Sequence, residues 1–215
     1  HRRNFLNKTG TLGIGLMTTR FLGRVITVSS HHREALGEKI RIIGRILTPD
    51  CQPITNAKVE IWQACASGKY QHEYDGNPAP VDPNFQYWGY AMTQQNGIGT
   101  RRRTTEPAMI RQYAFTTVKP GGYPVTRDWQ RPPHIHFKVI APSLPPLITQ
   151  LYFEEEQELN QSDHILQRIP IEQRSLVTTT LKTDPKDSKR VGQFDIILGQ
   201  SDVKKVTPHL DSHQA

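Results

Sequence analysis

Cysteine is scarce in this sequence, with only Cys51 and Cys65 in 215 residues. Cys51 lies in a turn-like segment, TPDCQPI, and Cys65 follows the next predicted strand. About eight residues of extended strand separate them, roughly 26 Å, whereas a disulfide needs α-carbons within about 7 Å. The sequence therefore predicts two free thiols and disfavours a bond between them. A bond to another chain is the less favoured alternative.

Long apolar runs are also missing. No stretch is long and apolar enough to cross a bilayer, so we predict no membrane span. Internal repeats and low-complexity segments are absent from the sequence as well. A chain of 215 residues suits one domain that encloses a single hydrophobic core.

Acidic residues do not occur before Glu34. The first 30 residues carry five of the seven net positive charges, which leaves +2 for the rest of the chain. A nucleic-acid-binding protein usually concentrates positive charge on its folded surface. The charge pattern therefore disfavours a nucleic-acid partner.

The basic N-terminal segment, HRRNFLNKTGTLGIGLM, resembles a twin-arginine export signal. Arg2 and Arg3 are paired, Phe5 and Leu6 follow, and a weakly apolar Gly/Leu stretch comes next. Two further arginines interrupt that stretch. We predict that residues 1–30 form such a signal, which would place the protein in the periplasm or outside the cell. The alternative is a basic tail on a cytoplasmic protein.

Strand signals dominate the remaining residues. Glycine and proline number 15 and 16, and short Val/Ile/Tyr/Phe-rich runs alternate with turn residues. The predicted strands are 39–47, 57–64, 87–93, 111–118, 133–140, 147–153 and 192–198, with one short helix at 171–177. This pattern predicts an all-β fold, an antiparallel β-sandwich with long functional loops and little helix. We assign the sandwich to residues 31–205 and a polar tail to 206–215.

His134 and His136 lie two residues apart in a predicted strand, within WQRPPHIHFK. Alternate residues of a strand point to the same face, about 6.6 Å apart along the chain. The two imidazoles would therefore project together, which suits two ligands of one metal ion. Such a pair is often merely structural or solvated, so the presence of further ligands decides whether this pair binds a metal ion.

Two common ways to complete a His-x-His site fit poorly. A cupin site needs a glutamate four or five positions later, and residues 137–143 contain no acid. A three-histidine zinc site would need His72 or His164, and nothing in their context marks them. Tyrosine is the alternative ligand type. A phenolate is a hard anionic oxygen donor, which a strongly Lewis-acidic ion such as Fe(III) stabilises at neutral pH.

Several longer motifs extend this pattern: GEKIRIIGRILTPDCQPITNAKVEIWQACASGKYQHEYD, APVDPNF, TTVKPGGYP, WQRPPHIHF and LITQLYFE. They resemble the intradiol ring-cleaving dioxygenases, and among these most of all the protocatechuate 3,4-dioxygenases. The resemblance runs with gaps from residue 37 to residue 198. It implies a β-sandwich that holds a non-haem Fe(III) ion.

By this resemblance, the iron ligands would be Tyr70 (from GKY), Tyr123 (from GGYP), His134 and His136. Two tyrosinates, two neutral imidazoles and a hydroxide balance the charge of Fe(III). Other tyrosines compete with Tyr70 for its role, although the preceding Ser-Gly-Lys favours Tyr70. These competitors are Tyr74, Tyr87 and Tyr90.

The resemblance also implies a reaction and its catalytic residues. Arg131 would stabilise negative charge on the activated substrate, and Gln150 would lie near that substrate. Tyr123 would accept one of its protons. A catechol-type aromatic diol would react with O₂ and open between its two hydroxyl-bearing carbons, giving a cis,cis-muconate.

The sequence departs from the family in places that bear on the substrate. TRRRTTEPAMIR is inserted between NGIG and QYAF. We interpret it as a surface hairpin; alternatively Arg101, Arg102 or Arg103 attracts an anionic substrate or contacts another subunit of a homo-oligomer. Val125 stands where a pocket tryptophan is usual. The substrate is therefore open among protocatechuate, another substituted catechol and hydroxyquinol.

A different class of protein offers a second interpretation. An exported β-sandwich binding module could carry a structural or zinc-bound His-x-His, and Tyr70 and Tyr123 would then be ordinary residues. Colour separates the two interpretations, because tyrosinate bound to ferric iron absorbs visible light and a zinc or metal-free module does not.

Overall fold

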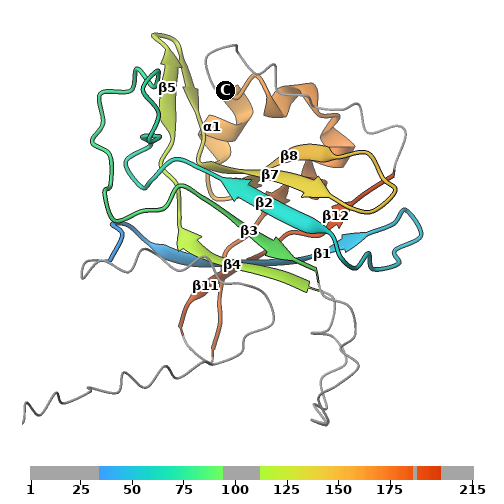
Figure 1. Ribbon diagram of the computed structural model, residues 1–215. Helices are drawn as coiled ribbons and strands as arrows, with labels where there is room; N and C mark the ends of the chain where they lie inside the picture. The colour runs from blue at the N-terminus through green and yellow to red at the C-terminus, as the bar shows by residue number, and fades with distance from the viewer. Residues whose placement is uncertain (1–33, 94–111, 186–187, 200–215) are drawn as a thin grey trace, which may run out of the picture.

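The computed structural model describes residues 34–93, 112–185 and 188–199. Strands make up most of its regular structure and the few helices are short, as Figure 1 shows. The prediction of an all-β chain with little helix is therefore confirmed. The predicted export signal at 1–30, the insertion with arginines 101–103 and the tail at 206–215 lie outside the described residues.

Two sheets and one ribbon contain the strands. The first sheet consists of β10 (Lys182–Thr183), β11 (Arg190–Gln193), β1 (Lys39–Leu47) and β12 (Ile196–Ile197), with β4 (Gln112–Val118) also paired to β1. The second consists, in spatial order, of β3 (Trp88–Met92), β2 (Lys58–Trp62), β7 (His134–Ile140), β8 (Leu147–Phe153) and β9 (Thr178–Thr179). The ribbon joins β5 (Tyr123–Thr126) and β6 (Trp129–Arg131). Every predicted strand has a counterpart, whereas the ribbon, β9 and β10 were not predicted.

The longest strand pairs are antiparallel, as the sequence pattern predicts. Shorter parallel pairs, which it did not indicate, join β1 to β11 and β12 and join β8 to β9. The predicted strand at 192–198 is interrupted between β11 and β12. There the Asp195 carboxylate accepts the backbone N–H of Arg45 at 2.8 Å, and the ladder beside β1 resumes at Ile196.

Alternating apolar side chains fill the space between the two sheets. Ile40 and Ile42 of β1 are fully buried, and so are Ile135 and Phe137 of β7. The Phe137 ring lies 6.2 Å from the ring of Phe115, which belongs to the first sheet. The two sheets therefore pack face to face, and β7 turns its histidine-bearing face away from this core.

The outer face of the second sheet is covered at one end. The β5–β6 ribbon stands beside β7 and β8 there, together with α1 (Gln157–Ser162), as Figure 1 shows. Leu166, in the short 3₁₀ helix η2 (Leu166–Arg168), and Ile169 pack with Tyr152 of β8. The helix predicted at 171–177 is a 3₁₀ helix, η3 (Ile171–Leu176), and α1 was not predicted. This cover allows polar side chains to be buried on the outer face.

Both cysteines are free thiols, as predicted, with Cys51 exposed and Cys65 buried. Among the residues that the structure describes, no helix has the length and apolar character to span a membrane.

Candidate metal centre

β7 and β8 bring four polar side chains together on the covered outer face. His136 pairs across the strands with Gln150, and His134 pairs with Tyr152. Cross-strand partners share a face of the sheet, and so do residues two apart on one strand. All four residues are buried. Trp62 of β2 stacks on the His136 ring, with ring centroids 4.8 Å apart and planes at 10°.

The ring nitrogens of the two histidines face a common point. His134 Nδ1 lies 2.7 Å from the carbonyl oxygen of Pro132. A carbonyl oxygen only accepts, so Nδ1 carries the proton and His134 Nε2 has a free lone pair. His134 Nε2 lies 3.2 Å from His136 Nε2. Two nitrogens about 2.1 Å from one ion and at right angles would lie about 3.0 Å apart, so the spacing suits two ligands of one ion.

Both imidazoles are held in the neutral form that binds metals. Burial, reinforced by the nearby positive charge of Arg131, lowers the pKa of His136 to about 3. Burial and the same arginine lower the pKa of His134 well below its ordinary value. Each ring therefore keeps a lone pair available at neutral pH.

Close contact between two glycine-containing loops positions the two tyrosines. Gly68 has a φ of +82°, and a β-carbon there would overlap the carbonyl oxygen of Gly122. Only glycine permits this conformation and this approach without strain. Tyr70 and Tyr123 come directly after these contacts, in GKY and GGYP. The glycines of both motifs thus bring two loops, distant in sequence, to one place.

The two tyrosine rings lie beside the histidine pair. Ring centroids are 5.5 Å apart for Tyr70 and Tyr123, 6.5 Å for Tyr70 and His136, and 5.6 Å for Tyr123 and His134. The Tyr70 backbone N–H donates to the Asp75 carboxylate at 2.7 Å, which fixes its loop. The Tyr70 hydroxyl is buried without a hydrogen-bond partner in the described part of the chain. A buried hydroxyl in that state is costly unless another group binds it.

Burial controls the protonation of both phenols. It raises the pKa of Tyr70 well above the ordinary value, and the neighbouring Tyr123 adds to this effect. Burial also raises the pKa of Tyr123, although the Arg131 charge opposes it. Both side chains therefore stay protonated at neutral pH unless a strongly Lewis-acidic cation lies against their oxygens.

The donor set fits ferric iron. Two phenol rings lie beside two imidazoles whose Nε2 atoms are 3.2 Å apart. The buried Tyr70 hydroxyl has no hydrogen-bond partner among residues 34–93, 112–185 and 188–199. Hard anionic oxygen donors favour a hard trivalent ion, whereas zinc prefers nitrogen and sulfur. The same residues contain no group of three His, Cys, Asp or Glu side chains suited to a metal ion. The zinc alternative therefore lacks its further ligand there.

Several of the residues that could compete for these roles have other contacts. Tyr74 is exposed, and its ring contacts that of His72 at 5.3 Å. The Tyr87 hydroxyl is bonded to the backbone of Asp82. His164, which with His72 was one of the two alternatives for a third zinc ligand, is exposed and stacks on Trp129 with ring centroids 4.6 Å apart.

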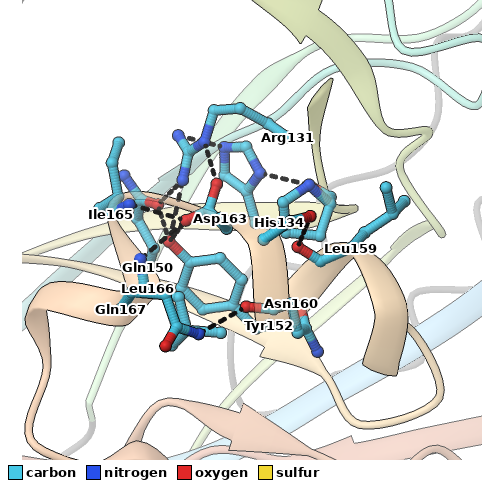
Figure 2. A network of polar contacts seen from close by, with 12 residues as sticks. Arg131, His134, Gln150, Tyr152, Leu159, Asn160, Asp163, Ile165, Leu166 and Gln167 are labelled. Atoms are coloured by element: carbon cyan, nitrogen blue, oxygen red, sulfur yellow. Dashed lines mark hydrogen bonds and ion pairs between the residues drawn. The ribbon is translucent and has the colours of Figure 1, made fainter. Parts of the chain in front are cut away.

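Arg131 lies next to the histidine pair, in the polar network of Figure 2. Its side chain is buried, and its Nε donates to the Asp163 carboxylate at 3.0 Å. Its Nη1 lies 3.1 Å from His134 Nε2 and donates to the lone pair that a metal ion would otherwise take. Its Nη2 donates to Gln150 Oε1 at 2.7 Å and to the Tyr152 hydroxyl at 2.8 Å. The candidate residues Arg131 and Gln150 therefore belong to the same cluster as the histidines.

Sequence reasoning missed two members of this network, Tyr152 and Asp163. Tyr152 could have been found, because it lies two residues after Gln150 in LITQLYF and so shares its face. Asp163 gave no such signal, since it follows α1 in an irregular segment far from the motifs. Its position depends on how the outer cover folds over the sheet.

Comparisons with known proteins show the family of this chain. A family model described as Dioxygenase matches residues 24–200. The chain is 36% identical over 171 residues to the protocatechuate 3,4-dioxygenase beta chain of Burkholderia cepacia, covering 77% of this chain and 66% of that one. It is 27% identical over 129 residues to hydroxyquinol 1,2-dioxygenase of Rhizobium sp. (strain MTP-10005), covering 54% of this chain and 38% of that protein.

The solved structures support the fold. The crystal structure of 3-chlorocatechol 1,2-dioxygenase from Rhodococcus opacus 1CP matches with a TM-score of 0.53 at 19% identity, covering 77% of this chain and 61% of that one. The chain thus matches two thirds or less of the length of these relatives.

Proposed function

Because this chain belongs to the intradiol ring-cleaving dioxygenase family, we propose that it opens the ring of a catechol-type aromatic diol with O₂. Cleavage falls between the two hydroxyl-bearing carbons and gives a cis,cis-muconate. The cofactor is a non-haem Fe(III) ion, with Tyr70, Tyr123, His134 and His136 as its ligands. The observation that carries this proposal is the meeting of two phenol rings with two neutral imidazoles whose Nε2 atoms lie 3.2 Å apart.

Ferric iron bound at these four residues would supply a Lewis acid that acidifies the diol and withdraws electron density from its ring. The neutral state of His134 and His136 leaves the two tyrosines as the anionic side chains of the site. With two phenolates, the protein offsets two of the three positive charges of such an ion. A diol that binds as an anion then adds the remaining negative charge.

Tyr123 is suited to move a proton in this reaction. Burial raises the pKa of its hydroxyl, so its phenolate has a strong tendency to take up a proton. The residue begins β5 and is half-buried, whereas the Tyr70 hydroxyl is fully enclosed. The Tyr123 oxygen therefore accepts a proton from one substrate hydroxyl, and Tyr70 remains in place.

Arg131 supplies a fixed positive charge beside the reacting centre. Burial disfavours its charged form, but Tyr152, Tyr123 and Asp163 raise its pKa above the ordinary value, so it stays charged. A charge held in a buried place, with donors already oriented, stabilises negative charge that develops on the substrate. Gln150 is bonded to the same guanidinium and lies on the same face.

For the substrate we propose a protocatechuate-like catechol. The support is the identity to the protocatechuate dioxygenase beta chain, which is higher than that to the hydroxyquinol enzyme. Catechol and hydroxyquinol are the controls, because names among the relatives include dioxygenases of both.

The proposal is tested by anaerobic titration of the iron-loaded protein with these three diols, followed by admission of ¹⁸O₂. We expect a visible absorption band from tyrosinate and ferric iron, a change of that band on diol binding, and a ring-opened diacid carrying two ¹⁸O atoms. A colourless protein that holds iron without consuming any diol would contradict the proposal. A product whose ring is cleaved at a bond other than the one between the two hydroxyl-bearing carbons would contradict the proposed position of cleavage.

A further inference from the structure

Asp163 connects the outer cover of the sheet to the guanidinium beside the histidine pair. The residue is fully buried and comes directly after α1. Its two carboxylate oxygens have different partners. Oδ1 accepts the backbone N–H groups of Ile165 and Leu166 at 3.1 and 2.7 Å, and Oδ2 accepts Arg131 Nε at 3.0 Å.

The contacts of Arg131 fix the direction of its guanidinium. Asp163 holds the Nε edge, while Gln150 and Tyr152 hold Nη2 on the other edge. A planar group held at two edges cannot rotate, so Nη1 is directed toward His134 Nε2 (Figure 2). Asp163, Gln150 and Tyr152 take three of the five N–H groups of this guanidinium. With a metal ion on His134 Nε2, that nitrogen could no longer accept from Arg131, so both N–H groups on Nη1 would be left for a substrate oxygen next to the metal ligands.

Tyr152 reinforces this arrangement. Its hydroxyl accepts from Arg131 Nη2 at 2.8 Å and donates to Gln150 Oε1 at 2.6 Å. The Gln150 Oε1 thus accepts from two donors, so the oxygen end of the amide faces Arg131. Its Nε2 is buried without a hydrogen-bond partner among the described residues.

Charge gives a second reason for a carboxylate at this position. A buried guanidinium next to a cation site is repelled by the cation, and removal from water adds to the cost. The side chains of Arg131 and Asp163 are 5% and 0% exposed, so solvent does not screen their attraction. The carboxylate therefore offsets a positive charge that the site would otherwise repel.

From these contacts we propose that Asp163 is a positioning residue for the reaction, which acts by holding Arg131 beside His134. The inference rests on the proposed function. Asp163 lies outside the motifs that resemble the family, and it aligns the Arg131 guanidinium. Tyr152 is the second residue that supports this alignment. Asp163 itself does not touch the substrate.

The substitution Asp163→Asn separates this role from a structural one. Asparagine keeps an oxygen for the backbone N–H groups of Ile165 and Leu166, but it presents N–H groups to Arg131 Nε and so releases the guanidinium. The matched control is Asp195→Asn in the first sheet. The Asp195 carboxylate likewise accepts a backbone N–H and a guanidinium, both from Arg45.

The experiment measures iron content, kcat and KM for the best diol, and anaerobic diol affinity from the visible band. For D163N we expect kcat per bound iron to fall roughly 10- to 100-fold, while KM and anaerobic affinity stay near the wild-type values. D195N should leave kcat close to wild type. In an Arg131→Gln background, D163N should cause no further loss, because its target is already absent.

Each outcome decides one question. An inactive wild-type protein overturns the proposed function and this inference with it. An active wild type together with a D163N kcat equal to that of D195N, or a full further loss in the R131Q background, overturns only the inference. If D163N does not fold, Tyr152→Phe replaces it, and a wild-type kcat for Y152F then overturns the inference.

Discussion

His134 Nε2 and His136 Nε2 lie 3.2 Å apart on the covered face of the second sheet, and each belongs to a neutral ring. The spacing follows from the two-residue repeat of β7, and the neutrality follows from burial and the charge of Arg131. The register of β7 with β8 adds Gln150 and Tyr152 to the same face. One strand pairing thus places the two histidines next to Gln150 and Tyr152.

His136→Ala should lose most of the bound iron. The substitution removes one of the two converging nitrogens and the ring that stacks on Trp62. We expect iron per chain to fall about tenfold or more, as determined by metal analysis after desalting. The control is His164→Ala, which removes an exposed ring from outside the proposed ligand set. Full iron occupancy in H136A would remove this residue from the site.

Tyr123→Phe should retain iron but bind substrate slowly. Three proposed ligands remain, while the proton acceptor for one substrate hydroxyl is lost. We expect diol binding roughly 100-fold slower in anaerobic stopped-flow measurements of the visible band. Tyr74→Phe, which alters an exposed tyrosine, should bind diol at the wild-type rate. Equal binding rates in Y123F and the wild type would argue against proton transfer to Tyr123.

The iron-free protein should lose stability as the pH falls from 7 to 5. The pKa of His136 is about 3 in the folded chain, against an ordinary value of 6.5. The unfolded chain therefore binds more protons between these values, and the contribution of His136 is complete above pH 6.5 and lost progressively toward pH 3. For this residue alone the loss between pH 7 and pH 5 is on the order of 2 kcal/mol. The lowered pKa of His134 adds to this loss of stability as the pH falls.

Urea unfolding at the two pH values measures this loss. His136→Gln removes the titrating group and should reduce the decrease in unfolding free energy by about 2 kcal/mol. The exposed His164 offers the control, since His164→Gln should show the wild-type decrease. The same decrease in H136Q as in the wild type would show that His136 does not titrate in this way.

Local sequence patterns predict the strands of this fold better than they predict its outer cover. β1 begins and ends where the sequence predicts a strand, and its side chains meet the core at nearly every second residue. β8 also has the predicted bounds, although both of its faces are buried in its second half. The β5–β6 ribbon escaped prediction because most of its side chains are exposed and Pro124 lies within it. α1 buries no residue of its own, so no apolar stripe marks it in the sequence.

In the candidate site, too, local features are predictable from the sequence and tertiary contacts are less so. His134 and His136 can be paired from the sequence because strand geometry is local, and two glycine motifs mark the tyrosine loops. The environment of Arg131 is predictable only in part. Tyr152 shares the face of Gln150 on β8, whereas Asp163 follows α1 and reaches Arg131 through tertiary packing of the cover on the sheet, which no short motif records.

Gly68→Ala tests whether the contact between the two loops places the tyrosines. Its φ of +82° disfavours any residue with a β-carbon, and that carbon would overlap the Gly122 carbonyl oxygen. The loops must then separate, which moves Tyr70 away from Tyr123. We expect a destabilisation of about 1–3 kcal/mol and weak iron binding, measured by urea unfolding and metal analysis.

Gly76→Ala is the matched control, because a β-carbon at Gly76 would meet no atom within 4 Å and the residue lies in the same long loop. It should change stability by no more than about 0.5 kcal/mol and leave the iron content unchanged. If G68A is destabilised yet binds iron as tightly as G76A, the loop contact stabilises the fold without positioning the ligands. If both variants lose iron equally, the effect belongs to the flexibility of the loop and not to the approach of Gly68 to Gly122.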